Sequence, residues 1–293
     1  MLLAQGVSAQ GGRVVRVETV QFNSKLVGAT LPYKVLLPPE YDRAAAPKTT
    51  ERFPVLYMLH GLSGHYTNWT EKTKLAEYAA QYHLIIVTPE GGDGWYTDSE
   101  TAPAEKYESY FMNELIPDVD ARFRTVQTRE GRAVAGLSMG GYGALKFGLK
   151  YPERFVFAAS ISGALDAALR TESNPGFAWD YVRPSVMKTF GPAGSKTRGA
   201  NDLHRLFLTL PTERVELLPF FYLSGGTEDG FLASSRELAS ILLKRKIPHE
   251  FRQLPGKHDW AFWDAQGREV LKMAAEKMPY IIVVKTTQKA AAR

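Results

Sequence analysis

A serine between two glycines, in the run Gly136-Leu137-Ser138-Met139-Gly140, constrains this chain more than any other feature. The strand-like run Arg132-Ala133-Val134-Ala135 precedes it, and a helix-like run from Gly143 to Lys150 follows it. Glycine at 136 and 140 lets a strand and a helix pass closely, in a turn whose backbone angles residues with a Cβ resist. A serine on such a strand–turn–helix corner exposes its hydroxyl. The pattern predicts a nucleophile elbow with Ser138 as the nucleophile.

The rest of the chain alternates strand-like and helix-like segments. Several strand-like runs, such as 84–87, are continuously apolar, which is typical of central strands covered on both faces by helices. We therefore expect one α/β domain over 13–284, with a mostly parallel sheet between helices. The strands without an intervening helix, 14–20 and 33–37, should form an antiparallel hairpin at one edge. The other expected strands are 55–59, 84–88, 133–135, 155–160, 220–223 and 249–253, and the expected helices are 72–82, 107–123, 141–151, 234–246 and 260–277.

Three segments interrupt this alternation. Residues 1–12 look unlike a folded element, and Val7-Ser8-Ala9 resembles the end of a secretory signal, although a basic start and a long apolar core are missing. A signal remnant and a flexible leader both fit, and the small-residue end favours a secreted or periplasmic protein over a cytoplasmic one. Residues 164–212 show turns and only short helical patches. An insertion there would lie over the carboxyl ends of the strands, as a lid or pocket wall. The Ala/Lys-rich residues 285–293 are expected to be a flexible tail.

Composition excludes several classes of function. The 293 residues carry a net charge of +5, but the basic residues are scattered and form no stripe with aromatics, so we expect no nucleic-acid partner. The chain contains no run of eighteen apolar residues, so no membrane span is expected. It has no cysteine, which excludes disulfides, thiolate catalysis and cysteine-ligated zinc. We assign no metal ligands.

A serine nucleophile needs a histidine base and an acid that orients the base. In α/β-hydrolases these residues follow one another as Ser, Asp or Glu, then His, each after a strand. The turn after the strand 220–223 supplies Asp229, and the glycine-containing turn after 249–253 supplies His258. We predict the triad Ser138–His258–Asp229, with Glu228 as the alternative acid on the same turn.

An oxyanion hole requires two backbone N–H groups aimed at the developing negative oxygen. One should come from Met139, which follows the nucleophile at a helix N-terminus, where the helix dipole favours an anion. The other should come from the loop after the strand 55–59, which reads Leu59-His60-Gly61-Leu62-Ser63-Gly64. We expect the Leu62 N–H in this role. The same glycines could also serve only to turn the chain.

Several longer motifs resemble one family. The runs Leu36-Leu-Pro-Pro-Glu-Tyr41, Pro54-Val-Leu-Tyr-Met-Leu-His-Gly61, Gly136-Leu-Ser-Met-Gly-Gly-Tyr-Gly-Ala144, Gly226-Thr-Glu-Asp229 and His258-Asp-Trp260 are similar to those of the putative-esterase family. This family includes tributyrin, feruloyl and acetylxylan esterases, esterase D-like S-formylglutathione hydrolases and mycolyltransferases. The resemblance covers about residues 14–280. It implies an α/β-hydrolase fold and acyl-ester hydrolysis without a cofactor.

The substrate expectation is a small ester, free or attached to a carbohydrate. We expect a serine carboxylesterase for short-chain or phenolic acyl esters, with a feruloyl or acetylxylan esterase, or an acyltransferase with the same triad, as alternatives. S-formylglutathione hydrolases usually carry a cysteine near the site, so its absence counts against that activity; a non-catalytic binding protein would usually have lost a triad residue. The expected substrate contacts are His60, Gly61, Trp95, Trp179 and Trp260, with Tyr66, Trp69 and Trp263 as further aromatic walls. Each aromatic residue could equally be part of the core.

Overall fold

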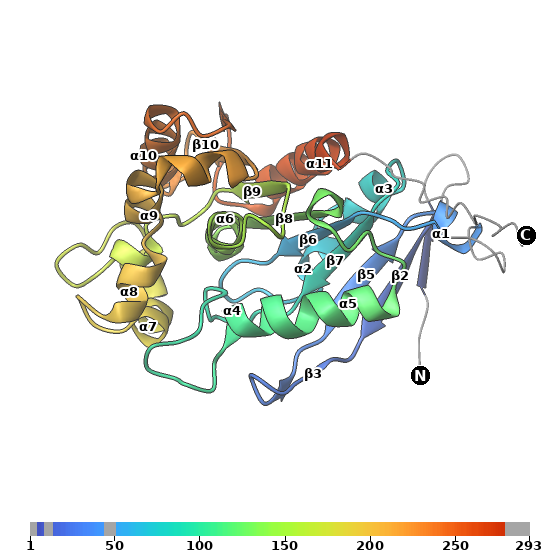
Figure 1. Ribbon diagram of the computed structural model, residues 1–293, viewed down its shortest axis with the longest axis horizontal. Coiled ribbons are helices and arrows are strands. Elements are labelled where there is room, and N and C mark those ends of the chain that lie inside the picture. The colour runs from blue at the N-terminus through green and yellow to red at the C-terminus, as the bar shows by residue number, and fades with distance from the viewer. Residues whose placement is uncertain (1–4, 9–13, 44–50, 279–293) are drawn as a thin grey trace, which may run out of the picture.

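Strands of this protein form one twisted sheet with helices on both faces (Figure 1). The computed structural model describes residues 5–8, 14–43 and 51–278. In these residues nine strands join in the order β1-β2-β5-β7-β6-β8-β9-β10-β11. The strands are β1 Gln5–Ser8, β2 Val14–Val20, β5 Tyr33–Leu37, β6 Val55–Leu59, β7 Ile85–Pro89, β8 Arg132–Leu137, β9 Phe157–Ile161, β10 Phe220–Gly226 and β11 His249–Leu254.

The strands from β7 through β11 in this order run parallel, and β1, β2 and β5 pair antiparallel at one edge. The predicted α/β fold and the antiparallel pairing of 14–20 with 33–37 are confirmed. The expectation for residues 1–12 is wrong in one part, because Gln5–Ser8 forms strand β1 against β2. Such pairing uses backbone groups of an open sheet edge and leaves little trace in side-chain pattern. The rest of 1–12 and the tail 285–293 lie outside the described residues.

The sheet is apolar on both faces, because alternate side chains of its central strands enter different cores. In β6, Val55, Tyr57 and Leu59 join one core, and Leu56 and Met58 join the other. The first core packs against α4 Tyr107–Tyr110, α5 Ile116–Arg122, α6 Met139–Lys150 and α10 Leu232–Lys244. The second packs against α3 Leu75–Ala79 and α11 Trp260–Lys277, on the other side of the sheet (Figure 1). The predicted helix 107–123 is a continuous stretch in which Phe111–Leu115 makes a π-helical turn between α4 and α5.

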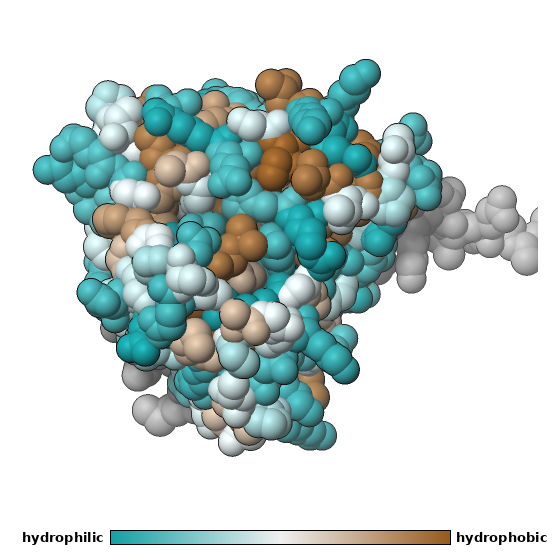
Figure 2. All heavy atoms as spheres, turned by 90° about the vertical axis from the view of Figure 1, so that its left-hand side faces the viewer, coloured by the Kyte–Doolittle hydropathy of each residue, from teal (hydrophilic) through white to brown (hydrophobic). Residues whose placement is uncertain are grey.

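The segment between β9 and β10 carries α7 Trp179–Phe190, α8 Lys196–Asn201 and α9 Leu203–Thr209. These helices gather at one end of the molecule (Figure 1), which Figure 2 shows with scattered hydrophobic patches among hydrophilic side chains. The helix α7 is longer than the short patches expected there. Its buried Val182, Val186 and Phe190 repeat at a spacing of four, which places them on one face toward the first core. Two short helices, α1 Glu40–Arg43 and α2 Asn68–Glu71, complete the pattern. No helix among the described residues is long and apolar enough to cross a membrane.

Candidate active site

Ser138 lies on the sharp turn between β8 and α6. Its φ of 54° and ψ of −118° are strained for a residue with a side chain. The two neighbouring glycines are required by space. A Cβ at Gly136 would lie 2.3 Å from the Gly140 carbonyl oxygen, and one at Gly140 would lie 2.5 Å from the Leu59 carbonyl oxygen. The corner therefore has the geometry of a nucleophile elbow.

The structure brings Ser138, His258 and Asp229 together from three separate strand ends. His258 Nε2 lies 3.0 Å from Ser138 Oγ, and His258 Nδ1 lies 3.0 Å from Asp229 Oδ2. The carboxylate can only accept, so Nδ1–H donates to Asp229 and Nε2 is left to accept the serine proton. This chain of contacts is the arrangement in which a histidine can act as a base toward a hydroxyl.

Asp229 is held in one orientation. Its residue is only 5 % exposed, and its Oδ1 accepts the Phe231 N–H at 2.9 Å. Burial by itself would raise the pKa of Asp229, but the hydrogen bond and charge of His258, together with the Phe231 N–H, lower it. Glu228 points elsewhere: its side chain is 62 % exposed, and its Oε2 lies 3.6 Å from Lys257 Nζ.

The ring of His258 is fixed by aromatic neighbours. Trp263 meets it edge-on and Phe231 meets it at a tilt, each with ring centroids 4.9 Å apart. These contacts limit rotation of the imidazole, so Nε2 stays directed at Ser138.

Two backbone N–H groups next to Ser138 have no partner among the described residues. In the described chain, neither the Leu62 nor the Met139 N–H has a protein acceptor. Leu62 lines the same pocket as Ser138, and Met139 is the first residue of α6. The loop passes close to the elbow at Gly61, where a Cβ would lie 2.7 Å from Leu137 Cδ1 and 3.2 Å from Ser138 Cβ. A side chain at 61 would therefore push the Leu137 side chain and Ser138 away from the loop.

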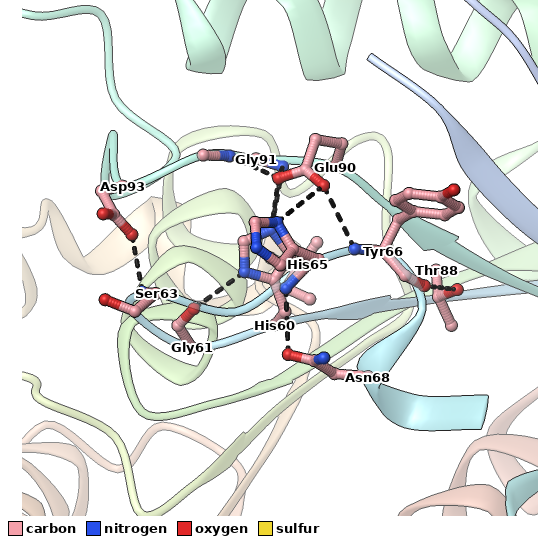
Figure 3. Close-up of polar contacts among 12 residues, drawn as sticks. His60, Gly61, Ser63, His65, Tyr66, Asn68, Thr88, Glu90, Gly91 and Asp93 are labelled. Carbon is pink, nitrogen blue, oxygen red and sulfur yellow. Dashed lines mark hydrogen bonds and ion pairs between the residues drawn. The ribbon is translucent and has the colours of Figure 1, made fainter. Parts of the chain in front are cut away.

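His60 joins this loop to the loop that follows β7 (Figure 3). It is 1 % exposed; its Nδ1–H donates to the Gly61 carbonyl at 2.8 Å, and its Nε2 accepts the Gly91 N–H at 2.9 Å. Glu90 Oε1 lies 3.3 Å from the same Nε2. The expectation that His60 contacts substrate is therefore not met. The ring is buried, and both of its nitrogens make hydrogen bonds to the backbone of the two loops that it joins.

The pocket over Ser138 holds about 270 Å³. Gly61 and Trp260 line it as expected, and so does Trp263. Sequence reasoning missed Asn68, Lys72 and Tyr181, which also line it. The spacing of Asn68 and Lys72 by four residues after a loop was the available signal, since such residues share a helix face.

Four other residues expected at the pocket do not line it: Tyr66, Trp69, Trp95 and Trp179. Trp95 is 1 % exposed, donates from Nε1 to Ser185 Oγ at 3.0 Å and packs against Tyr142 and Phe190. Its positive φ of 53° belongs to a turn that places the indole in the core, away from the pocket. Trp179 lines a neighbouring depression on α7, which shares only Tyr181 with the pocket over Ser138.

The comparison with protein families decides the membership of the chain. Residues 24–269 match the model of the family described as "Putative esterase". The chain belongs to this esterase family. It is 30 % identical over 253 residues to an acetyl esterase from Caldicellulosiruptor saccharolyticus, which covers 84 % of this chain and 92 % of that protein. The protein is thus a carboxylic ester hydrolase.

Solved structures agree on the fold of this esterase. A ferulic acid esterase superimposes with a TM-score of 0.75 at 23 % identity, over 90 % of this chain and 98 % of that one. An S-formylglutathione hydrolase from Agrobacterium tumefaciens gives 0.77 at 22 % identity, over 95 % of this chain and 99 % of that one. At these identities the likenesses establish the α/β-hydrolase fold.

Proposed function

We propose that this esterase hydrolyses short-chain or phenolic acyl esters through a covalent acyl-enzyme on Ser138. The observation that carries the proposal is the unbroken path from Ser138 Oγ through His258 to Asp229, with 3.0 Å at each step. A hydroxyl, a base and a buried acid in this order are what an acyl transfer to serine requires.

In the first half of the reaction, Ser138 Oγ attacks the ester carbonyl carbon while His258 Nε2 takes its proton. The Asp229 carboxylate stabilises the imidazolium. The carbon–alcohol bond then breaks, and the leaving alcohol takes the proton from His258. In the second half, water loses a proton to His258 and attacks the acyl carbon. The bond to Ser138 Oγ then breaks, the acid leaves, and His258 returns the proton to Ser138 Oγ.

The Leu62 and Met139 N–H groups bind the oxygen on which negative charge develops. Both are unpaired within the described chain, and the Met139 N–H lies at the positive end of α6. Donors fixed in this way stabilise the tetrahedral state without reorganising.

The walls of the pocket are suited to binding small acyl groups or aromatic rings. Trp260 and Trp263 form one side, and Tyr181 of the 164–212 insertion forms another. Tyr181 Oη lies 3.0 Å from Ser63 Oγ, so the insertion reaches across to the oxyanion loop as a pocket wall. The acetyl esterase relative supports a short acyl group, and the aromatic walls support a phenolic one.

The test is Ser138→Ala, with p-nitrophenyl esters from acetate to decanoate, methyl ferulate and acetylxylan as substrates. We expect kcat to fall by about 10³-fold or more for every ester that the wild type cleaves. Ser240→Ala, on the exposed side of α10, is the control and should keep wild-type rates. A fluorophosphonate probe should label Ser138 alone by mass spectrometry. Near wild-type hydrolysis by Ser138→Ala refutes the proposal, and failure of the probe to react points to a non-catalytic protein.

A further inference from the structure

The pocket over Ser138 has a charged side that the proposed mechanism does not use. Lys72 and Asn68 both line the pocket, one helical turn apart along α2 and its C-terminal cap. Residues spaced by four share a helix face. The two side chains therefore present an ammonium and an amide to the same space as the nucleophile.

The ammonium of Lys72 is not neutralised. Its Nζ lies 5.1 Å from the centre of the Trp260 ring, a cation–π contact that holds the side chain against the pocket wall. Over the described ranges Lys72 forms no ion pair, and the carboxylate of its neighbour Glu71 lies toward Lys34 instead. Glu71 lies 3.9 Å from Lys34, and the Lys74 N–H donates to Asp264.

Asn68 adds a hydrogen-bond donor beside this charge. Its Oδ1 accepts the His65 N–H at 2.9 Å, which orients the amide (Figure 3). Because the oxygen is engaged, the Nδ2 group is the free part of the side chain, and among the described residues it has no acceptor.

Among the residues that the structure describes, none that lines the pocket is acidic. The carboxylates beside its loops stand outside the lining and are engaged elsewhere: Asp93 accepts the Ser63 N–H at 2.6 Å, and Asp259 accepts the Phe262 N–H at 3.0 Å. The pocket therefore offers a cation and N–H donors without an opposing carboxylate. A substrate carboxylate matches this set, because charge-assisted N–H donors bind carboxylates strongly.

We infer that Lys72 and Asn68 form a subsite that selects esters carrying a carboxylate next to the scissile bond. This inference rests on the proposed function, since the subsite acts on the substrate that Ser138 attacks. The carboxylate can belong to the acyl group, as in a half-ester of a dicarboxylic acid, or to the alcohol, as in an acylated hydroxy acid.

The experiment compares matched anionic and neutral esters. For the acyl side we use mono-p-nitrophenyl succinate against p-nitrophenyl butyrate, and for the alcohol side 4-acetoxybenzoate against its methyl ester. The readout is the ratio of kcat/KM, anionic over neutral, within each pair. We expect Lys72→Met to lower the ratio about fivefold in one pair, mainly through KM, as for a partly exposed ion pair. Lys72→Glu should lower it further, Lys72→Arg should restore it, and 0.5 M NaCl should shrink the wild-type ratio.

Lys74→Met is the control, since Lys74 is exposed, two residues away and outside the pocket lining. It should leave both ratios at the wild-type value. An unchanged ratio in Lys72→Met, or an equal loss in Lys74→Met, overturns the subsite even if every ester is hydrolysed.

A binding measurement separates this inference from the proposed function. Calorimetry with 4-hydroxybenzoate and with succinate, on Ser138→Ala and on the same protein carrying Lys72→Met, reports the subsite without catalysis. Binding of either anion that is weakened by Lys72→Met supports the subsite even if Ser138 proves not to be the nucleophile. Equal binding of both anions in the two proteins overturns it.

Discussion

The Nε2 atom of buried His60 accepts the backbone N–H of Gly91 at 2.9 Å, and this bond joins the loop after β6 to the loop after β7. Two further hydrogen bonds connect the same two loops (Figure 3). Asp93 accepts the Ser63 N–H at 2.6 Å, and Glu90 accepts the Tyr66 N–H at 3.3 Å. The Leu62 N–H lies between these fixed points, so its direction is set by residues that do not touch the pocket.

Glu90→Gln should therefore impair the oxyanion hole from a distance. Loss of the charge beside His60 loosens the loop that presents the Leu62 N–H, which acts only in the transition state. We expect kcat to fall about tenfold with little change in KM, measured with p-nitrophenyl acetate. Glu105→Gln, which removes a carboxylate paired with Lys188 outside the site, is the control. A rise in KM at constant kcat would show that Glu90 affects substrate binding instead.

Asp229→Asn should reduce kcat by about 10³- to 10⁴-fold, because an amide cannot stabilise the imidazolium and favours the wrong tautomer. Glu228→Gln should stay within about threefold of wild type, since this exposed carboxylate faces Lys257. Steady-state kinetics on the two variants make the comparison. A collapse of activity in Glu228→Gln alone means that the acid has been assigned to the wrong residue.

Gly140→Ala should destabilise the protein strongly. The added Cβ would lie 2.5 and 2.6 Å from the carbonyl oxygens of Leu59 and His60. Both contacts are with backbone atoms, which can move away only if the strand or the helix is displaced. We expect a loss of about 2–4 kcal/mol in the free energy of unfolding. The matched control is Gly199→Ala in α8, where the nearest atom to a Cβ is the end of the Arg205 side chain at 3.9 Å. That variant should be neutral or gain up to about 1 kcal/mol. Urea unfolding of both proteins is the measurement, and equal effects would argue against the tight strand–helix crossing.

Stability should depend on pH through Glu90. Burial would raise the pKa of this carboxyl, but the backbone N–H groups of Gly92 and Tyr66, which donate to it, lower it below its ordinary value. A folded-state pKa below the unfolded one adds stability that is present above about pH 4.5 and is lost as the pH falls through the folded-state pKa.

The measurement is the free energy of unfolding of wild type and Glu90→Gln between pH 3 and 7. The variant should be less stable at pH 7, and the difference in free energy of unfolding between the two proteins should shrink as the pH falls below about 4.5. A difference that stays constant over this range would assign the loss to packing and not to ionisation.

The amino-acid sequence by itself determined the framework of this esterase. The strands 14–20, 33–37 and 55–59 have the predicted bounds, because periodicity and apolar runs are local properties of the chain. The order Ser138, Asp229, His258 was also readable, since each residue follows a strand in a glycine-rich turn. The fold then carries these strand ends to one edge of the sheet.

Tertiary structure alone decided which side chains face the pocket. Trp95 follows β7 as expected, but a left-handed turn places its indole in the core against Tyr142 and Phe190. Lys72 and Tyr181 carry no motif, and they enter the pocket because α2 and α7 pack beside the elbow from distant parts of the chain. The direction of a side chain on a loop depends on contacts made across the whole fold, and these contacts are not encoded by the neighbouring residues in the sequence.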